Sequence, residues 1–283
     1  MLTYLQAIFF GALQGVTELF PISSLGHTVI LPKVIGWDVA QYNETFVIFI
    51  VATHVATALV LLGFFWKDWI HMMFGFFRSV QARKIPEGDT YAKLIWLIIV
   101  ATIPAGLLGL LLDKKIESLF DEPARAALFL IANGFLLYGA ELLRRKQADK
   151  ESVGSLDEGI VRISLLQSFG IGAMQALALF PGISRTGSAL AGGLLAKLNH
   201  EEAARFSFFL ATPLILAAGV LKLPKLIHVS SVTVLPILAG SVISAVAAYL
   251  SVRFLSRYFK RNTLIPFALY CVVAGVIAYL VVR

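Results

Sequence analysis

Two stretches of the sequence combine chemically reactive side chains with apolar surroundings. Residues 14–27 are QGVTELFPISSLGH, and residues 175–187 are QALALFPGISRTG. Both contain a glutamine, a Leu-Phe-Pro element, a serine and a glycine, although aligning them needs a one-residue gap. Ionisable side chains are costly at membrane depth and usually mark a functional site there. We therefore expect the two stretches to meet in one polar site within a membrane protein.

The first stretch offers a carboxylate and a hydroxyl close to an imidazole. Gln14 and Glu18 are four residues apart and lie on one face of a helix. An ionised Glu18 can accept a proton or bind a divalent cation, because Mg²⁺ and Ca²⁺ prefer oxygen ligands. Ser24 and His27 share a face of a helix that begins after Pro21, and this pairing suits nucleophilic attack with acid–base assistance. The structural alternatives are a helix-capping serine, a helix-bonding histidine and a carboxylate satisfied by a neighbouring helix.

The second stretch offers a guanidinium at the start of a helix. Arg185 lies within PGISRTGS, residues 181–188, between two apolar half-helices. A helix N-terminus together with a guanidinium forms a phosphate-binding cradle. The alternative is that Arg185 only forms an ion pair with Glu18.

The composition predicts an all-α integral membrane protein with a single membrane domain over residues 1–283. Of the 283 residues, 58% are hydrophobic and 14% are charged, whereas soluble domains have about 45–50% and about 25%. Several apolar runs reach about 20 residues, enough to cross a bilayer as helices. The net charge of +7 comes largely from basic residues in short loops, which favours the positive-inside pattern over nucleic-acid binding.

The hydrophobic runs predict six spans and two broken segments. The predicted spans are 44–65, 92–112, 124–143, 205–223, 232–252 and 263–282. Residues 2–36 and 160–197 each contain two half-length helices around a proline, which is typical of a re-entrant helical hairpin.

Loop charges predict how these segments are oriented. The loops 66–91, 144–159 and 253–261 are rich in Lys and Arg, and they share one side only if 160–197 enters and leaves by the same face. The second hairpin then opens to the cytoplasm and the first opens outward. This describes an inverted-topology repeat, with residues 1–143 and 160–283 as its halves, and such repeats place their sites near the bilayer midplane.

Two other residues receive structural interpretations. His54 is a lone histidine on an apolar face. The alternatives are a residue that lines the cavity and a satisfied core histidine, and we favour the second. Cys271 is the single cysteine and lies in an apolar run, so no disulfide framework exists.

The motifs QGVTE, FPISSLGH and PGISRTGS resemble those of the undecaprenyl-diphosphate phosphatase family, of the bacitracin-resistance protein type. The resemblance covers nearly the whole chain. It implies hydrolysis of undecaprenyl diphosphate to undecaprenyl phosphate and inorganic phosphate with Mg²⁺ or Ca²⁺, which recycles the lipid carrier for peptidoglycan synthesis. It also implies a multi-pass protein of the bacterial cytoplasmic (inner) membrane that binds an isoprenyl diphosphate lipid and no nucleic acid. A homodimer is the candidate oligomeric state.

The resemblance assigns roles to the motif residues. The candidate residues are, for catalysis, Ser24, His27 and Glu18; for diphosphate binding, Arg185, Ser184, Ser23 and Thr186; and for the metal, Glu18 and Gln14. Gln14 at the first motif position leaves one carboxylate rather than two for the metal, and Leu25 replaces a threonine that is often found there.

Other functions are compatible with parts of this pattern. The broad lipid-phosphatase superfamily also uses Ser, His and Arg. Its last motif needs a histidine six residues after the arginine, and this chain has Ala191 there, which disfavours this alternative. A transporter or flippase of an anionic isoprenyl phosphate lipid could use the same broken helices and the same cradle. Whether Ser24 attacks covalently, or Glu18 and His27 activate water, stays open from the sequence.

Overall fold

The computed structural model describes residues 2–37, 44–117, 122–145, 155–222 and 231–283. Most of these residues are helical, and the described part of the chain has no strand. The elements are α1 (Tyr4–Thr17), α2 (Ser24–Ile35), α3 (Glu44–Phe64), α4 (Trp66–Ala82), α5 (Thr90–Glu117), α6 (Pro123–Arg145), α7 (Leu156–Ile160), α8 (Leu165–Gln175), the 3-10 turn η2 (Ala176–Leu179), α9 (Arg185–Leu195), α10 (His200–Lys222), α11 (Ser231–Tyr258) and α12 (Ile265–Val282).

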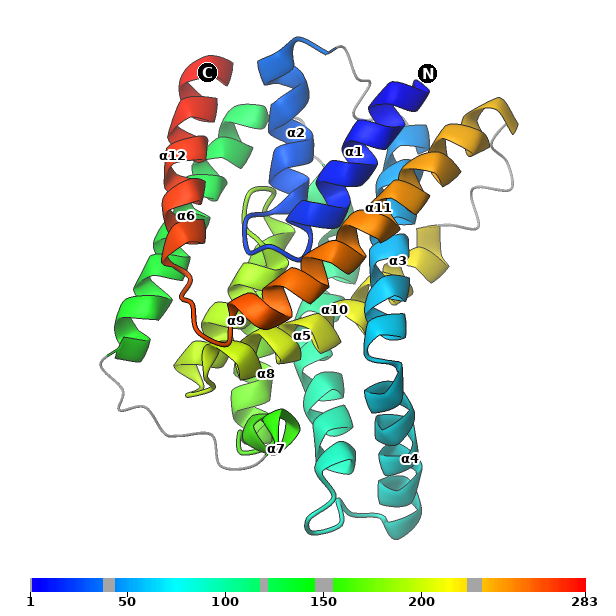
Figure 1. Ribbon diagram of the computed structural model, residues 1–283, viewed down its shortest axis with the longest axis vertical. Coiled ribbons are helices and arrows are strands. Elements are labelled where there is room, and N and C mark those ends of the chain that lie inside the picture. The colour runs from blue at the N-terminus through cyan, green and yellow to red at the C-terminus, as the bar shows by residue number, and fades with distance from the viewer. Residues whose placement is uncertain (1, 38–43, 118–121, 146–154, 223–230) are drawn as a thin grey trace.

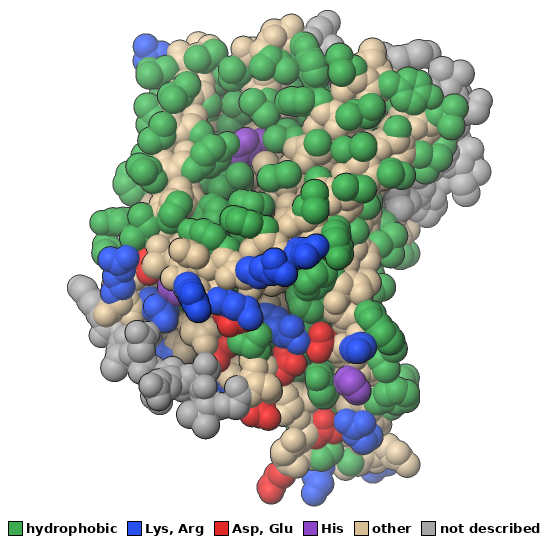
Figure 2. Space-filling model, in the orientation of Figure 1, with side chains coloured by type: hydrophobic (Ala, Val, Ile, Leu, Met, Phe, Trp, Pro, Cys, Tyr) green, Lys and Arg blue, Asp and Glu red, His purple; other side chains and the backbone are tan. Residues whose placement is uncertain are grey.

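Six helices of the described segments are long and apolar enough to cross a membrane: α3, α5, α6, α10, α11 and α12. They overlap the six predicted spans, so the prediction of an all-α multi-pass membrane protein is confirmed. The predicted loop 253–261 is wrong over its first part, because α11 continues to Tyr258 with Leu255 buried in the core. On the face shown in Figure 2, hydrophobic side chains cover most of the upper part, whereas most Lys, Arg, Asp and Glu side chains gather in the lower part. This separation of apolar and charged surface is the one expected of a protein embedded in a bilayer.

The prediction of a loop over residues 66–91 is wrong for its first part, because residues 66–82 form the helix α4. Its charged residues suggested a loop, but Met72, Gly75 and Ser79 are buried at helical spacing. The contact with α5 is tight at Gly75, where a Cβ atom would lie 2.5 Å from the backbone nitrogen of Ala92. Trp96 Nε1 donates to Ser79 Oγ at 2.9 Å, which joins α5 to α4.

An ion pair at the end of this helical pair holds it together. Asp89 Oδ1 accepts a hydrogen bond from Ala92 N at 3.0 Å, and Arg78 donates to Asp89 Oδ2. Partial burial works against ionisation of Asp89, but the bond from Ala92 and the guanidinium of Arg78 lower the pKa of this carboxyl.

The two broken helices begin in the same way. Thr3 and Gln6 form a capping box at the start of α1, and Ser164 and Gln167 form the same motif at the start of α8.

Both outer ends of the α1–α2 pair lie at the end of the molecule that also holds the two chain termini (Figure 1). The helices α4 and α7 lie at the opposite end. The assignment of these pairs as re-entrant hairpins of an inverted repeat stays a prediction.

Each first half-helix crosses a long helix from the other half of the chain. At Gly15 of α1, a Cβ atom would lie 2.3 Å from the carbonyl oxygen of Ser244 on α11. At Gly172 of α8, it would lie 2.0 Å from that of Ala101 on α5. Close backbone contact through small residues is how helices associate in membranes. These two crossings fix the position and direction of the half-helices that carry the motifs.

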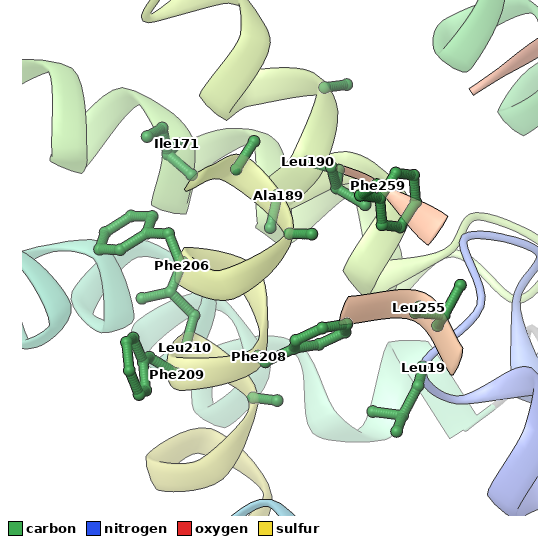
Figure 3. Close-up of a cluster of buried hydrophobic side chains, with 14 of the residues drawn as sticks. Leu19, Ile171, Ala189, Leu190, Phe206, Phe208, Phe209, Leu210, Leu255 and Phe259 are labelled. Carbon is green, nitrogen blue, oxygen red and sulfur yellow. The ribbon is translucent and has the colours of Figure 1, made fainter. Parts of the chain in front are cut away.

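The helix α10 forms the centre of the packed core. Phe206, Phe208 and Phe209 are each at most 1% exposed. Figure 3 shows these side chains among Ile171 of α8, Leu190 of α9 and residues of α11. Because α9 packs directly on α10, this core supports the helix that begins with Arg185.

Candidate active site

The two helix breaks present their first helical residues in the same way. Ser23 precedes α2, and its Oγ accepts a hydrogen bond from Gly26 N at 3.2 Å. Ser184 precedes α9, and its Oγ accepts from Gly187 N at 3.1 Å. A serine at this position satisfies a free backbone N–H at the helix start. Each capping serine is followed at once by a predicted site residue, Ser24 in one break and Arg185 in the other.

The two breaks touch each other in the middle of the molecule. Thr186 Oγ1 donates to the carbonyl oxygen of Glu18 at 2.8 Å, although the two residues are 168 positions apart. Asn133 on α6 connects both turns, because its Nδ2 donates to Pro21 O at 2.9 Å and its Oδ1 accepts from Ser184 N at 3.0 Å. The prediction that the two motifs form one site therefore agrees with the geometry.

Glu18 is the centre of this site. Its side chain is buried, and its Oε1 lies 2.6 Å from Arg185 Nη2. Its Oε2 accepts hydrogen bonds from Ser24 Oγ at 2.5 Å and from Gln14 Nε2 at 3.0 Å. Burying a carboxylate is costly unless it is paired and hydrogen-bonded, and these contacts meet that requirement. They also place the Ser24 hydroxyl directly on a base.

Arg185 keeps part of its guanidinium unused. Its Nη1 atom is buried and has no hydrogen-bond partner among the described residues. The ion pair with Glu18, which was the structural alternative for Arg185, is thus present but uses only one end of the guanidinium. An anion with several oxygens can be bound by the other end.

His27 has different partners from those that the sequence suggested. Its Nδ1 lies 2.6 Å from the carbonyl oxygen of Ser23, one helical turn earlier, and its Nε2 lies 2.7 Å from the hydroxyl of Tyr270 on α12. The expected pairing of Ser24 with His27 is replaced by the bond from Ser24 to Glu18. The physical reason is that both nitrogens of the imidazole are already engaged elsewhere.

The predicted diphosphate-binding hydroxyls all have partners within the fold. Ser23 and Ser184 cap their helices, and Thr186 bonds to the backbone of Glu18. Their assignment to diphosphate binding stays a prediction. What they do in the structure is hold the helix N-termini and Arg185 in place.

Sequence reasoning missed three residues of the site. His54 was interpreted as a satisfied core histidine, but its Nε2 lies 3.1 Å from Glu18 Oε2. Asn133 and Tyr270 were not considered. His54 and Asn133 were detectable as isolated polar residues in the middle of apolar spans. Tyr270 gave no such signal, because tyrosine is common in membrane helices.

The side chains of the site can be compared with those that a bound Mg²⁺ or Ca²⁺ would need. Among the described residues, no group of three or more His, Cys, Asp and Glu side chains could hold a metal ion. Glu18 and Gln14 fit a weaker arrangement, in which Mg²⁺ is held by one carboxylate and completes its coordination with substrate phosphates and water. The residues present are therefore compatible with an ion that enters together with a phosphorylated substrate.

These features define a multi-pass all-α membrane protein with a buried carboxylate, hydroxyl and guanidinium at the meeting point of two broken helices. The family model of the bacitracin resistance protein BacA matches residues 7–277. The chain is 47% identical over 293 residues to the undecaprenyl-diphosphatase of Mycolicibacterium paratuberculosis, covering 97% of this chain and 95% of the relative. It is 45% identical over 269 residues to undecaprenyl-diphosphatase 2 of Burkholderia thailandensis, covering 95% and 93%.

The chain belongs to the bacitracin resistance protein BacA family. The predicted family is confirmed, and with it the prediction that the protein is a membrane enzyme.

Proposed function

We propose that the protein hydrolyses undecaprenyl diphosphate to undecaprenyl phosphate and inorganic phosphate. The reaction would recycle the lipid carrier of peptidoglycan synthesis in the bacterial inner membrane. The observation that carries this proposal is the bond from the Ser24 hydroxyl to Glu18, with Arg185 on the other oxygen of the same carboxylate. The names of the relatives point to the same substrate.

In the first step, Arg185 binds the terminal phosphate through its free Nη1 and then through the whole guanidinium. Glu18 takes the proton of Ser24, and Ser24 Oγ attacks the terminal phosphorus. The bond between that phosphorus and the bridging oxygen breaks, and undecaprenyl phosphate leaves with the electron pair. Phosphoryl transfer of this kind depends on positioning and on charge stabilisation by groups such as the arginine.

In the second step, water attacks the phosphoserine and releases inorganic phosphate. His27 has a proton on Nδ1, since this atom faces a carbonyl oxygen, so its Nε2 has the lone pair. Once water replaces the Tyr270 hydroxyl at Nε2, this nitrogen accepts a proton from the attacking water. Glu18 returns its proton to Ser24 Oγ as the bond to phosphorus breaks. The enzyme is then back in its starting state, with the water proton passing from His27 to the product or to solvent.

We further propose that Mg²⁺ or Ca²⁺ enters with the diphosphate and is held by Glu18 and Gln14. When bound, a divalent ion would neutralise part of the phosphate charge. The topology proposed with this function has α1–α2 and α8–α9 as re-entrant hairpins, with the first pair open to the outer face.

The test is phosphate release from undecaprenyl diphosphate by purified protein in detergent, with Mg²⁺, with Ca²⁺ and with EDTA. We expect metal-dependent release that Glu18→Gln abolishes. Glu141→Gln is the matched control, because Glu141 is also a buried carboxylate paired with a histidine, but lies outside the site. Lipid binding without phosphate release under any condition would contradict the proposal and favour a flippase. Full activity in EDTA would overturn only the metal assignment.

A further inference from the structure

Tyr270 of α12 is bonded to a predicted catalytic residue although it lies 243 positions away in the sequence. Its hydroxyl oxygen is 2.7 Å from His27 Nε2, and the two rings are nearly parallel, at an interplanar angle of 10°. Nothing in the first motif predicts this contact. It is the hydrogen bond that connects the imidazole of His27 to another helix.

The hydrogen-bond geometry fixes which group donates. A carbonyl oxygen can only accept, so the bond of 2.6 Å between His27 Nδ1 and Ser23 O requires a proton on Nδ1. A neutral imidazole then has a lone pair on Nε2, and the Tyr270 hydroxyl must donate to it. The Ser23 carbonyl therefore fixes the tautomer whose Nε2 can act as a base, and the Tyr270 hydroxyl holds the ring in place by donating to that nitrogen.

Tyr270 also lies where the site meets the outer surface of the protein. His27 is 6% exposed, whereas Tyr270 is 44% exposed and has Leu269 and Val273 exposed beside it on α12. The helix α12 is one of the six apolar spans, so this exposed face is turned to lipid. The phenol thus reaches from the lipid-facing surface to the imidazole.

From this arrangement we infer that Tyr270 is a positioning residue for His27 in the hydrolytic reaction. Its hydroxyl keeps the imidazole oriented by donating to the Nε2 lone pair, until a water molecule replaces the hydroxyl at Nε2. Its ring forms the lipid-facing wall beside which the first isoprenyl units of the substrate pass. The inference rests on the proposed function, since it assigns Tyr270 a role that acts through His27.

The matched test compares Tyr270→Phe with Tyr138→Phe. Both tyrosines lie on apolar spans and are similarly exposed, at 44% and 46%. Tyr270→Phe keeps the ring and loses only the hydroxyl, so we expect kcat for undecaprenyl diphosphate to fall about tenfold, a fraction of the effect of losing the base itself. KM should change less than about threefold, because the phosphate-binding groups are untouched. Tyr138→Phe should leave both parameters unchanged.

A double-mutant cycle with His27→Ala decides whether Tyr270 acts through His27. If it does, adding Tyr270→Phe to His27→Ala causes no further loss of kcat, since the positioned group is already absent. The melting temperature of each variant in detergent shows whether it is folded.

Two results would overturn the inference. One is a folded Tyr270→Phe protein with the kcat of the wild type, and the other is a double variant whose losses multiply. A His27→Ala protein with full activity would instead contradict the proposed role of His27. An inactive wild-type protein would contradict the proposed function as a whole.

Discussion

Ser23 and Ser184 occupy equivalent positions in the two helix breaks, yet the side chains around them differ. Both serines cap a helix through the backbone N–H three residues later. The residue after the cap is Ser24 in the first break and Arg185 in the second. A serine cap therefore precedes the proposed nucleophile in one break and the proposed phosphate-binding cation in the other, and Glu18 contacts both side chains.

The backbone adopts a positive φ at different residues in the two breaks. Ser23 itself has a φ of 69°, a left-handed conformation that non-glycine residues rarely adopt, whereas in the second break Gly182 has the positive φ, of 110°. Strain held at a non-glycine residue is typical of a functional site. The first break keeps a serine in this conformation directly before the proposed nucleophile.

Two further pairs of equivalent positions differ in their hydrogen bonds. In each pair, the polar side chain of the first break has a partner and that of the second break has none among the described residues. One turn into each second helix, His27 corresponds to Ser188, whose buried hydroxyl has no hydrogen-bond partner among the described residues. Gln14 bonds to Glu18, whereas both amide atoms of the buried Gln175 are also without a partner there. These differences support the proposal that the first break carries out the reaction and that the second contributes mainly Arg185.

The largest expected effect is that of replacing Arg185, the main residue that the second break contributes to the site. Arg185→Ala should lower kcat/KM about 10³-fold or more, as for arginines that stabilise phosphoryl transfer. Arg185→Lys should recover only part, because an ammonium cannot replace a planar guanidinium. Phosphate release measures both, with Arg253→Ala on the exposed end of α11 as the control. Near-normal activity of a folded Arg185→Ala protein would mean that the second break is not needed for the chemistry.

The next test exchanges equivalent positions of the two breaks. His27→Ala should lower kcat about 10²-fold, the usual contribution of a general base. Ser188→Ala should change it less than about twofold, because the hydroxyl makes no hydrogen bond in the described structure. Equal losses in steady-state assays of the two variants would remove the asymmetry between the breaks.

A smaller effect is expected at His54, which bonds to the same carboxylate oxygen as Ser24. His54→Leu should lower kcat about tenfold, because Glu18 loses a donor that holds it when Arg185 turns to the substrate. His54→Gln keeps a side-chain N–H and should recover most of the rate. His71→Gln, outside the site, is the control. If the leucine variant is as active as the wild type, His54 is the core histidine that the sequence suggested.

The smallest effects should appear at the two glutamines. Gln175→Leu should leave activity unchanged and keep or raise the melting temperature, because an unsatisfied buried polar group costs about 1–3 kcal/mol. Gln14→Leu should lower kcat several-fold, because it removes a hydrogen bond to Glu18. Thermal unfolding in detergent and phosphate release distinguish the two. A large loss of stability in Gln175→Leu would show that this amide has a structural role after all.

Much of the fold could be predicted from the sequence because membrane spans depend on local hydrophobicity. The six spans and the two proline-containing breaks follow from runs of apolar residues and their interruptions. The helix α4 was missed because its buried face depends on contact with α5, which no local pattern shows.

The site could be predicted only as far as its residues lie within the two motifs. Glu18, Ser24 and Arg185 were found because charged and hydroxyl groups stand out in apolar sequence. The partners of each group depend on contacts across the whole chain, such as those of Asn133 and Tyr270. Such contacts depend on how the helices pack. For this reason the Ser24 hydroxyl, which the sequence paired with the His27 imidazole, bonds instead to the Glu18 carboxylate.

The most direct test of the central claim is to look for phosphate on Ser24. Purified protein is mixed with undecaprenyl diphosphate, quenched in acid within milliseconds to seconds, and analysed by mass spectrometry. If Glu18 activates Ser24 for attack, phosphoserine appears at residue 24 before steady state and accumulates further in His27→Ala, whose second step is slowed. If no phosphoserine forms at any time while phosphate is released, and Ser24→Ala keeps most of the activity, water attacks directly and the account is contradicted.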